Sequence, residues 1–458
     1  MIHQIGRRLR EQIHRFSGEL CTGLGKVATR FVEEMIYGIS SSGSVVLTKV
    51  ARALEEPIRV HDTHKRLSRN LGNKALRDEL SGKVLEQGAK RIKDDTVLIV
   101  DLSDLIKKYA KKMEYLARVR DSSEKKKGNG YWLCEVVGAE VGSCEITPLA
   151  QTLWSQVAED FVSENAEILE VVSKVLKATE KRGILALDRG GDRARFYQHW
   201  VPDESVDFII RQRVDRKLLH KGKAKQSLQL ANSCATPYRA TVLREKQGKE
   251  TVYQIEFGFL PVRLPRHPER QLYLVVVKGF GQEPLMLLTT KPMRKHRKVL
   301  WWIVEAYITR WRIEETIRFI KSCYELEDVR LLTYHRLQNM ASLVLAAAYF
   351  TAVWLGTQAK LKILAFHVLK AAKRIFGIPD FRYYALADGI QTILKRIGKG
   401  PVRQEEEGST CLPQLILFEL SEFLRELLWF FRLTRFLHQR YFDTIRIFSS
   451  LFIWWAIT

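Results

Sequence analysis

The sequence predicts an α/β protein, with a core domain that carries an all-β insertion and helical regions on either side. Two short apolar runs, TVLIV (96–100) and GILAL (183–187), are typical of strands that are buried on both faces of a sheet. The stretch between them contains AEILEVVSKVLKATEKRG, which has helical spacing and ends at a glycine. Strands, then a helix, then another strand indicate an α/β domain.

Three regions follow one another along the 458 residues, which are too many for one hydrophobic core. Residues 1–90 are predicted to be a basic helical domain that binds DNA, because two short helices around a turn suit that role; a plain helical bundle is the alternative. Residues 91–330 are predicted to be the α/β domain, with the β insertion at about 207–292. Residues 331–458 are predicted to be a helical region that serves packing and oligomerisation.

Shorter segments support this division. The two N-terminal helices are SGSVVLTKVARALEE and THKRLSRNLGNKALRDEL, and the strands after TVLIV are GYWLCEVVGAE and the segment around CEITPL. Within the insertion, TVYQIEFGF alternates in the manner of a strand. The predicted linkers are HKGKAKQ (220–226) and VRQEEEGST (402–410).

The charge of the chain indicates a polyanionic partner. Lysine and arginine number 75 against 52 acidic residues, which gives a net charge of +23. Nucleic acid is the first expectation, with an anionic membrane surface or a ribosome-like assembly as the alternatives. None of the six cysteines forms a C-x-x-C pair, so neither a zinc site nor a disulfide framework is expected.

One uncharged segment, between Arg336 and Lys360, is long enough to cross a bilayer. However, it contains polar residues, and its fully apolar part, LVLAAAYFTAVWL, has only 13 residues. We therefore expect a buried helix here and no association with a membrane. The N-terminus lacks the apolar region of a signal peptide, so a cytoplasmic protein is expected.

Each of the two buried runs leads directly into an aspartate, Asp101 after TVLIV and Asp188 after GILAL. A carboxylate in that position is held rigidly at the edge of a sheet, where a site can form. An aspartate also commonly caps the turn that follows a strand. Two such aspartates after matched runs favour a functional site.

Two further aspartates, Asp104 and Asp192, lie close behind the first two. We predict that Asp104 caps a helix with the sequence DLIKKYAKKMEYLA. We predict that Asp192 caps a turn or forms an ion pair with Arg193 or Arg195. The favoured pair therefore remains Asp101 and Asp188.

The stretch YITRWRIEETIRFIK (307–321) is predicted to be a helix with a polar row beside an apolar stripe. Because successive residues rotate by about 100°, Glu314 shares its side of the helix with Tyr307, Arg310, Arg318 and Lys321. Glu315 points about 100° away. The adjacent stripe consists of Trp302, Ala306, Ile313, Ile317 and Ile320. A solvated face with ion pairs is the alternative, but it does not explain a single carboxylate among cations.

Together, Asp101, Asp188 and Glu314 could hold metal ions. Mg²⁺ and Mn²⁺ prefer oxygen ligands. Two such ions, about 3.5–4 Å apart, activate the attacking oxygen and stabilise the leaving oxygen in phosphodiester chemistry. The neighbouring cations would then hold DNA phosphates.

The spacing Y-x2-R-x3-E-x6-K occurs at Tyr307, Arg310, Glu314 and Lys321. It resembles the signature of the DDE transposases of bacterial insertion sequences, in the YREK group (insertion-sequence family four). Four residues alone would be a weak signal, so the remainder of the chain has to support it.

Other stretches resemble the same group: RWRIEE (310–315), PLMLLTTKP (284–292), IVDLSD around Asp101 and LDRGGD around Asp188. The resemblance covers about residues 95–330 in order and spacing, including the β insertion between the second aspartate and the glutamate.

The resemblance implies an RNase H-like catalytic domain that cleaves the ends of an insertion sequence and joins them to target DNA with two divalent metal ions. It implies that Asp101, Asp188 and Glu314 are the catalytic and metal-binding residues. The DNA-binding residues would be Tyr307, Arg310 and Lys321, with Arg189 as a weaker candidate. Double-stranded DNA would be bound by a homodimer, in the bacterial cytoplasm at the nucleoid.

One position departs from the pattern of the group. Some relatives place a tryptophan just before the LLTT-like strand to stack on a flipped base, and the nearest residue here is Met286. Whether cleavage passes through a DNA hairpin therefore stays open. The alternative function is a DNA-binding protein, descended from or resembling a transposase, that no longer cuts. The three intact carboxylates argue against it.

Overall fold

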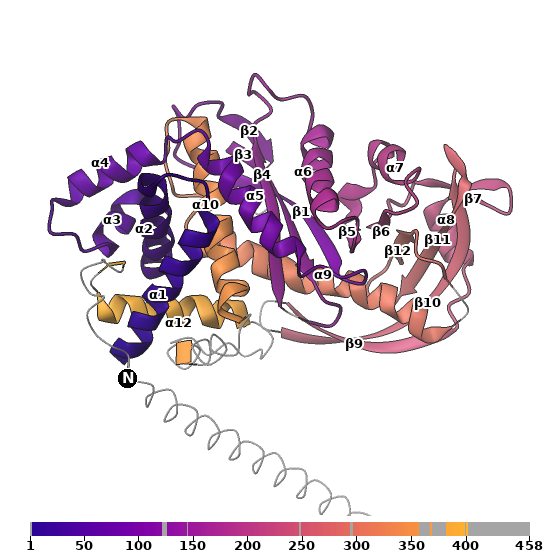
Figure 1. Cartoon of the computed structure of the whole chain (residues 1–458). Coiled ribbons are helices and arrows are strands. Elements are labelled where there is room, and N and C mark those ends of the chain that lie inside the picture. Colours follow the sequence, from indigo (N-terminus) through magenta and orange to yellow (C-terminus); the bar gives the residue numbers. More distant parts are fainter. Residues whose placement is uncertain are drawn as a thin grey trace, which may run out of the picture. The chain divides into compact units, whose positions relative to one another are not determined.

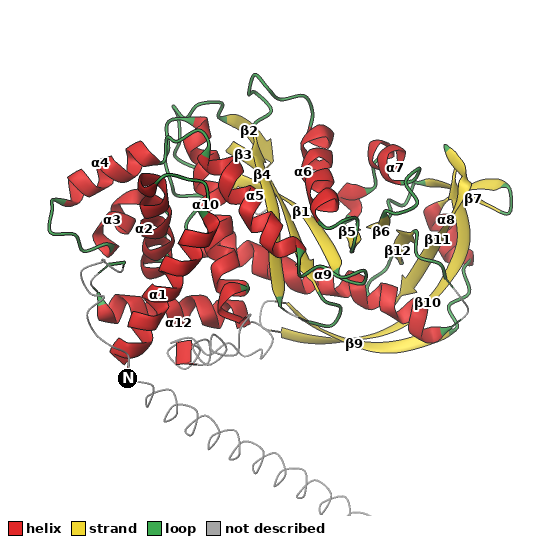
Figure 2. Cartoon of the chain, viewed as in Figure 1, coloured by secondary structure: helices red, strands yellow, loops and turns green. Residues whose placement is uncertain are grey.

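Five strands form the centre of the protein, and their order is that of an RNase H-like core, as predicted (Figures 1 and 2). The strands are β1 (Val97–Ile106), β3 (Lys127–Ala139), β4 (Ile146–Trp154), β5 (Ile184–Leu187) and β6 (Asp207–Arg211). They lie in the order β4-β3-β1-β5-β6. The first three pair antiparallel, whereas β5 runs parallel to β1, and β6 runs parallel to β5. The short strand β2 (Ala117–Arg120) pairs with β3.

The computed structural model describes residues 2–120, 126–143, 145–246, 249–293, 296–356, 367–368, 382–398 and 400–401. All of them belong to one compact unit, Met1–Pro401. The predicted linker at 402–410 and the predicted helices beyond it lie outside these residues, as do several side chains of the helix that carries Glu314.

The β insertion extends the central sheet and does not form a sheet of its own. From β6 the sheet continues through β12 (Leu285–Thr289), β11 (His267–Lys278), β10 (Lys249–Leu264), β7 (Lys217–His220) and β8 (Lys223–Gln226), while β9 (Tyr238–Lys246) pairs with β10. The predicted start of the insertion at 207 is wrong, because β6 is a strand of the core. The region is also not wholly β, since it contains the helix α8 (Ser227–Ser233).

The predicted linker HKGKAKQ is a β-hairpin. Lys221 and Gly222 at its tip have φ values of 49° and 75°. Two consecutive residues in the left-handed region form the tight turn whose twist matches paired strands. The polarity of the segment resembled that of a linker, but its lysines are simply the exposed side chains of a hairpin.

Helices cover both faces of the sheet because the side chains of β1 alternate between two apolar clusters. Val97 and Ile99 pack in the cluster that includes α9 (Arg297–Cys323). Leu98 and Val100 pack in the cluster that includes α6 (Glu164–Ala178) and α7 (Ala194–Trp200). Each face of β1 is therefore committed to a particular helix, which determines where the side chains of α9 lie.

The N-terminal region is helical, as predicted, with α1 (Ile2–Leu20), α2 (Lys26–Ser42), α3 (Leu47–Ala53), α4 (Val60–Asn70) and α5 (Leu76–Ala89). The second predicted helix, residues 63–80, is in fact divided between α4 and α5. Asn339 donates hydrogen bonds to the carbonyls of Leu71 and Asn73, both at 2.8 Å, and thereby holds the turn between them.

The uncharged segment forms α10 (Tyr334–Ala352), and nearly every residue of α10 is buried, as predicted. No described helix is long and apolar enough to span a bilayer. The short helix η2 (Trp354–Gly356) and α12 (Arg382–Ile397) follow. Apolar residues of α1, α2, α10 and α12 belong to the same cluster as those of α9, so the N-terminal helices share their core with the α/β domain.

Candidate active site

The pairing of β1 with β5 brings the two predicted aspartates together. Val97 lies opposite Ile184, and Ile99 lies opposite Ala186. Continuing this offset by two residues places Asp101 beside Asp188. Adjacent strands are roughly 4.8 Å apart, and both aspartates lie on the sheet face that α9 covers, because side chains alternate along a strand.

The setting of Asp101 differs from the prediction. The strand β1 continues to Ile106, so Asp101 lies inside the strand and does not end it. The predicted helix after Asp104 is wrong, because Asp104 is a buried strand residue and residues 107–116 form no helix. Instead, the Lys107 amide donates to the Asn129 carbonyl at 2.7 Å, so β3 holds this segment extended.

Asp188 follows β5 directly, as predicted, and its side chain is exposed. One carboxylate oxygen accepts a hydrogen bond from the Gly190 amide at 2.8 Å, which caps the short helix η1 (Arg189–Gly191). The capping role and a role in a site are therefore compatible, because a carboxylate can accept several hydrogen bonds.

Asp192 forms an ion pair, as predicted, but with a different partner, and it is buried. It forms an ion pair of 2.7 Å with Arg216 and accepts hydrogen bonds from the Tyr197 hydroxyl and the Arg213 amide. The predicted pairing with Arg193 or Arg195 is wrong. Arg193 binds Glu164 instead, which lies at the start of α6.

On α9, Glu314 is held by Arg310, whose Nη1 donates to its Oε1. Arg310 is only 3% exposed, and its guanidinium lies 5.0 Å from the ring centre of Tyr307, which is fully buried. Burial alone would lower the pKa of Arg310, but Tyr307, Glu314, Asp188 and Asp101 together raise it. One buried cation thus compensates the three carboxylates that the sequence singled out.

On α9, the buried residues are not confined to the predicted apolar stripe. Ala306, Ile317 and Ile320 are buried in the predicted stripe, but Tyr307 and Arg310 are buried as well. Neither side chain is accessible at the surface of this structure. The side chains of Arg312, Ile313, Glu315, Arg318 and Lys321 lie outside the described residues. Arg189 is exposed beside Asp188, where a phosphate could reach it.

Sequence reasoning missed Arg211, which ends β6. Leu187 lies opposite Ile210, and continuing this register places Arg211 beside Asp188. Burial raises the pKa of the Tyr307 hydroxyl, while Arg310 and Arg211 act to lower it, so Arg211 lies near the same centre. Arg211 is half-buried, and its side chain forms no hydrogen bond or ion pair with the described residues. The signal was present in the sequence, because DFIIR is a third apolar run that leads into a charged residue.

The donor atoms suit a hard divalent cation, since all three candidate ligands are carboxylates. In the parts of the chain that the structure describes, however, no three acidic, histidine or cysteine side chains lie close enough together to hold a metal ion. Arg310 supplies the compensating positive charge. The residues therefore fit a divalent ion by their chemistry, and the ion would have to share Glu314 with Arg310.

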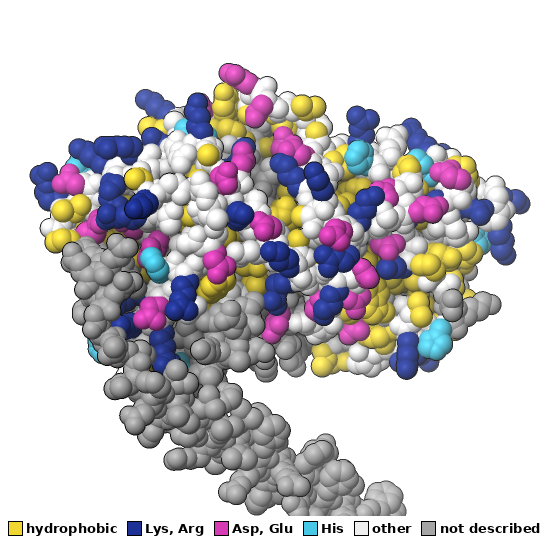
Figure 3. All heavy atoms as spheres, viewed as in Figure 1, with side chains coloured by type: hydrophobic (Ala, Val, Ile, Leu, Met, Phe, Trp, Pro, Cys, Tyr) yellow, Lys and Arg dark blue, Asp and Glu magenta, His cyan; other side chains and the backbone are white. Residues whose placement is uncertain are grey.

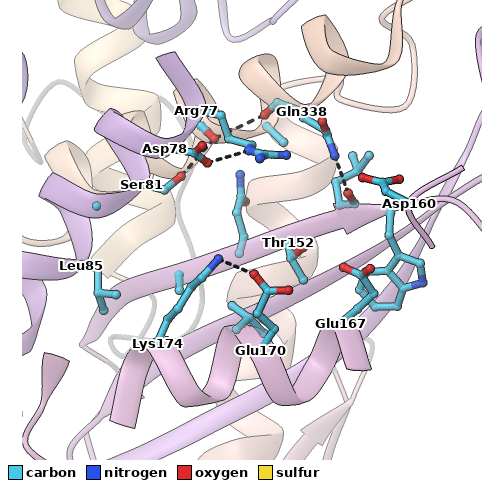
Figure 4. Close-up of a pocket in the computed structure, with 18 of the residues that line it drawn as sticks. Arg77, Asp78, Ser81, Leu85, Thr152, Asp160, Glu167, Glu170, Lys174 and Gln338 are labelled. Atoms are coloured by element: carbon cyan, nitrogen blue, oxygen red, sulfur yellow. Dashed lines mark hydrogen bonds and ion pairs between the residues drawn. The ribbon is translucent and has the colours of Figure 1, made fainter. Parts of the chain in front are cut away.

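A cavity of about 840 Å³ lies elsewhere, between α5, β4, α6 and α10 (Figure 4). Its lining contains Arg77, Asp160, Glu167 and Lys174 but none of the three candidate carboxylates.

Comparison with models of protein families gives a match over part of the chain. Residues 151–350 match the model of the family described as "Transposase DDE domain". The matched range is less than half of the chain; it includes Asp188 and Glu314 and begins after Asp101. No curated protein matches the chain.

One solved structure that resembles the chain is a piggyBac transposase in a synaptic complex with hairpin DNA. It shares 9% sequence identity, and the alignment covers 92% of this chain and 84% of that chain, with a TM-score of 0.41. A likeness this slight carries no argument about function.

The contrast between Asp188 and Asp192 predicts different effects on stability. Asp192→Ala leaves Arg216 without its buried partner and should cost about 3–5 kcal/mol. Asp188→Ala removes only an exposed capping bond, which costs about 1 kcal/mol. Thermal unfolding of both variants checks this. Equal losses of stability would contradict the separation of a functional from a structural aspartate.

Proposed function

We propose that Asp101, Asp188 and Glu314 are the catalytic carboxylates of this chain, a DNA transposase that carries a DDE domain at residues 151–350. The observation that carries the proposal is the strand register, which sets Asp101 beside Asp188 under α9. Arg310 links this pair electrostatically to Glu314. Asp101 lies outside the family match, so its assignment rests on this geometry.

The three carboxylates would hold two Mg²⁺ or Mn²⁺ ions, which DDE transposase domains generally require. Such ions activate the attacking oxygen and stabilise the leaving oxygen when a phosphodiester is cut or joined. The arginine side chains around the three carboxylates would have different roles. Arg310 orients Glu314 and prevents the carboxylates from repelling one another, while Arg211 and Arg189 offer positive charge to the DNA backbone.

We further assign the chain to the YREK group of bacterial insertion-sequence transposases, on the spacing of Tyr307, Arg310, Glu314 and Lys321. Its substrates would be the ends of the element and a target duplex. Two ends have to be joined together, so a homodimer is the expected working form, at the nucleoid. The charge of +23 supports DNA as the partner. Figure 3 shows lysine and arginine spread over one face of the protein among acidic residues.

The alternative, a DNA-binding protein without catalytic activity, has less support. It offers no reason for three carboxylates to converge on one buried arginine. Keeping like charges close together is costly unless a cation compensates them, and a protein without a metal to bind would gain nothing from this arrangement.

The first prediction for this site concerns the carboxylates. Asp101→Ala, Asp188→Ala and Glu314→Ala should each abolish Mg²⁺-dependent nicking of end DNA but leave DNA binding within about twofold, because cations and not acids contact phosphates. A nicking assay and a binding assay on the same samples measure both. Glu170→Ala, an exposed acid on α6, is the control. Normal cutting by Glu314→Ala would exclude Glu314 from the catalytic set.

The two arginines of the site should behave differently. Arg211→Gln should weaken DNA binding and reduce the slope of log K against log salt by about one unit, as the loss of one phosphate contact does. Arg310→Gln should leave that slope unchanged and slow nicking, because Arg310 is occupied by Glu314. An equal decrease of the slope in both variants would indicate that Arg310 also contacts a DNA phosphate directly.

Recognition of the element's ends is proposed for α4. Its Arg66 is used internally, in ion pairs of 2.5 Å and 2.7 Å with Glu34 and Glu56, whereas Lys65 and Arg69 are exposed. These two positions can therefore contact DNA without a loss of stability.

The double change of Lys65 and Arg69 to Ala should reduce the preference of the protein for end DNA over random duplex by about tenfold or more. Fluorescence anisotropy with duplexes taken from the DNA on either side of the gene, compared with random duplex, measures this preference. The whole chain is used, because the N-terminal helices share their core with α10. Lys174→Ala on α6 is the control, and an unchanged preference would place recognition elsewhere.

A further inference from the structure

A buried lysine lies at the end of the catalytic strand and has no assigned role. Lys107 follows β1 directly and is 2% exposed. Its Nζ donates hydrogen bonds to three main-chain carbonyls, those of Leu326, Glu327 (3.1 Å) and Val329 (3.0 Å). An ammonium group has three N–H bonds, so all of its donors are used. Burial lowers the pKa of Lys107 to about 7, against the opposing effect of Glu327 and Asp328.

These carbonyls belong to the connection between α9 and α10. The lysine therefore joins the two elements that carry Asp101 and Glu314, at a point beyond both residues. Burying a charged group is costly unless it is hydrogen-bonded. The three hydrogen bonds to this short segment offset that cost and hold the segment against the end of β1. A positive charge just beyond the end of a helix also interacts favourably with the helix dipole.

The segment that follows Lys107 forms further hydrogen bonds with the same connection. The amide of Glu114 donates to the Leu332 carbonyl at 2.9 Å. The Glu114 carboxylate accepts the amide of Tyr334, the first residue of α10, at 2.7 Å. Lys107 therefore binds the first half of the connection, and Glu114 binds its second half and the start of α10.

The N-terminal helices bind this connection too. The amide of Val45 donates to the Tyr324 carbonyl at 2.8 Å, and Lys49 forms an ion pair of 2.6 Å with Glu325. The connection is therefore the place where β1, α9 and the proposed DNA-binding region meet. A small displacement here would move α9 along the sheet.

We propose that Lys107 is a positioning residue that fixes α9 against β1 and thereby holds Glu314 at the level of Asp101. The inference rests on the proposed function, because it assigns Glu314 and Asp101 to one reaction centre. Lys107 touches neither DNA nor the reacting atoms. It acts by keeping a helix and a strand in register, and a misplacement of about 1 Å in such a site can cost roughly 100-fold in rate.

A purely structural lysine would behave differently, and the chain contains a matched control. Arg270 also donates to several carbonyls of one connection. They are those of Trp200 (3.1 Å), Val201 (2.6 Å), Asp203 (2.9 Å), Glu204 (3.4 Å) and Val206 (3.3 Å). That connection joins α7 to β6 and carries none of the proposed catalytic residues. Both arginine and lysine lose all of these bonds on replacement by methionine.

The test compares the full-length variants Lys107→Met and Arg270→Met. Hydrogen exchange is measured first, without metal or DNA. Lys107→Met should speed amide exchange at least tenfold in residues 324–334 and in the C-terminal half of α9, whereas Arg270→Met should change exchange only around residues 200–206. Nicking is then measured over a Mg²⁺ titration. Lys107→Met should raise the half-saturating Mg²⁺ concentration about tenfold or more, with DNA binding unchanged, while Arg270→Met keeps the normal requirement.

Lys107→Arg provides a second variant if Lys107→Met does not fold. A guanidinium can still donate to several carbonyls, so it should restore slow exchange and part of the Mg²⁺ response. The proposal is overturned if Lys107→Met lowers the melting temperature but leaves exchange in α9 and the Mg²⁺ titration unchanged. Where Lys107→Met does not fold, it is overturned if Lys107→Arg speeds exchange in α9 while the Mg²⁺ titration stays normal. If the unmodified protein does not nick DNA, the proposed function fails, and the exchange data still decide whether Lys107 fixes α9.

Discussion

The parallel pairing of β1 with β5 is the constraint on which the candidate site depends. It sets Asp101 level with Asp188, and the next pairing sets Arg211 level with both. Because the side chains of a strand alternate between two faces, a slip of one residue would turn Asp101 into the cluster beneath α6. The apolar residues on either side of it prevent that slip, since each face of β1 already packs against its own helix.

A buried guanidinium makes this convergence of acids tolerable. Arg310 is nearly inaccessible to water, and its raised pKa shows that the surrounding negative groups outweigh the cost of burial. The same arrangement prevents Arg310 from acting as a surface contact. The proposed contacts with a DNA backbone therefore fall to accessible side chains such as Arg211 and Arg189, which lie beside Asp188.

The N-terminal helices, α10 and α12 share one hydrophobic core with the α/β domain. Apolar residues of the first five helices, α9, α10 and α12 form one continuous cluster. The connection after α9 receives hydrogen bonds from the N-terminal region and from the extension of β1. The N-terminal region and the extension of β1 therefore both help to hold the C-terminal end of α9 in place.

The sequence by itself determined the apolar runs, the charged residues that follow them and the class of the fold, because strand and helix periodicity depend on neighbouring residues. It also predicted that Asp188 directly follows a buried strand, that Glu314 lies on a helix and that α10 is buried. Tertiary structure decided what depends on distant partners. It made Asp104 a strand residue through pairing with β3, bound Asp192 to Arg216, turned a linker into a hairpin and buried Tyr307 and Arg310. It also revealed Arg211 and Lys107, because strand register and burial arise only when segments far apart in the chain meet.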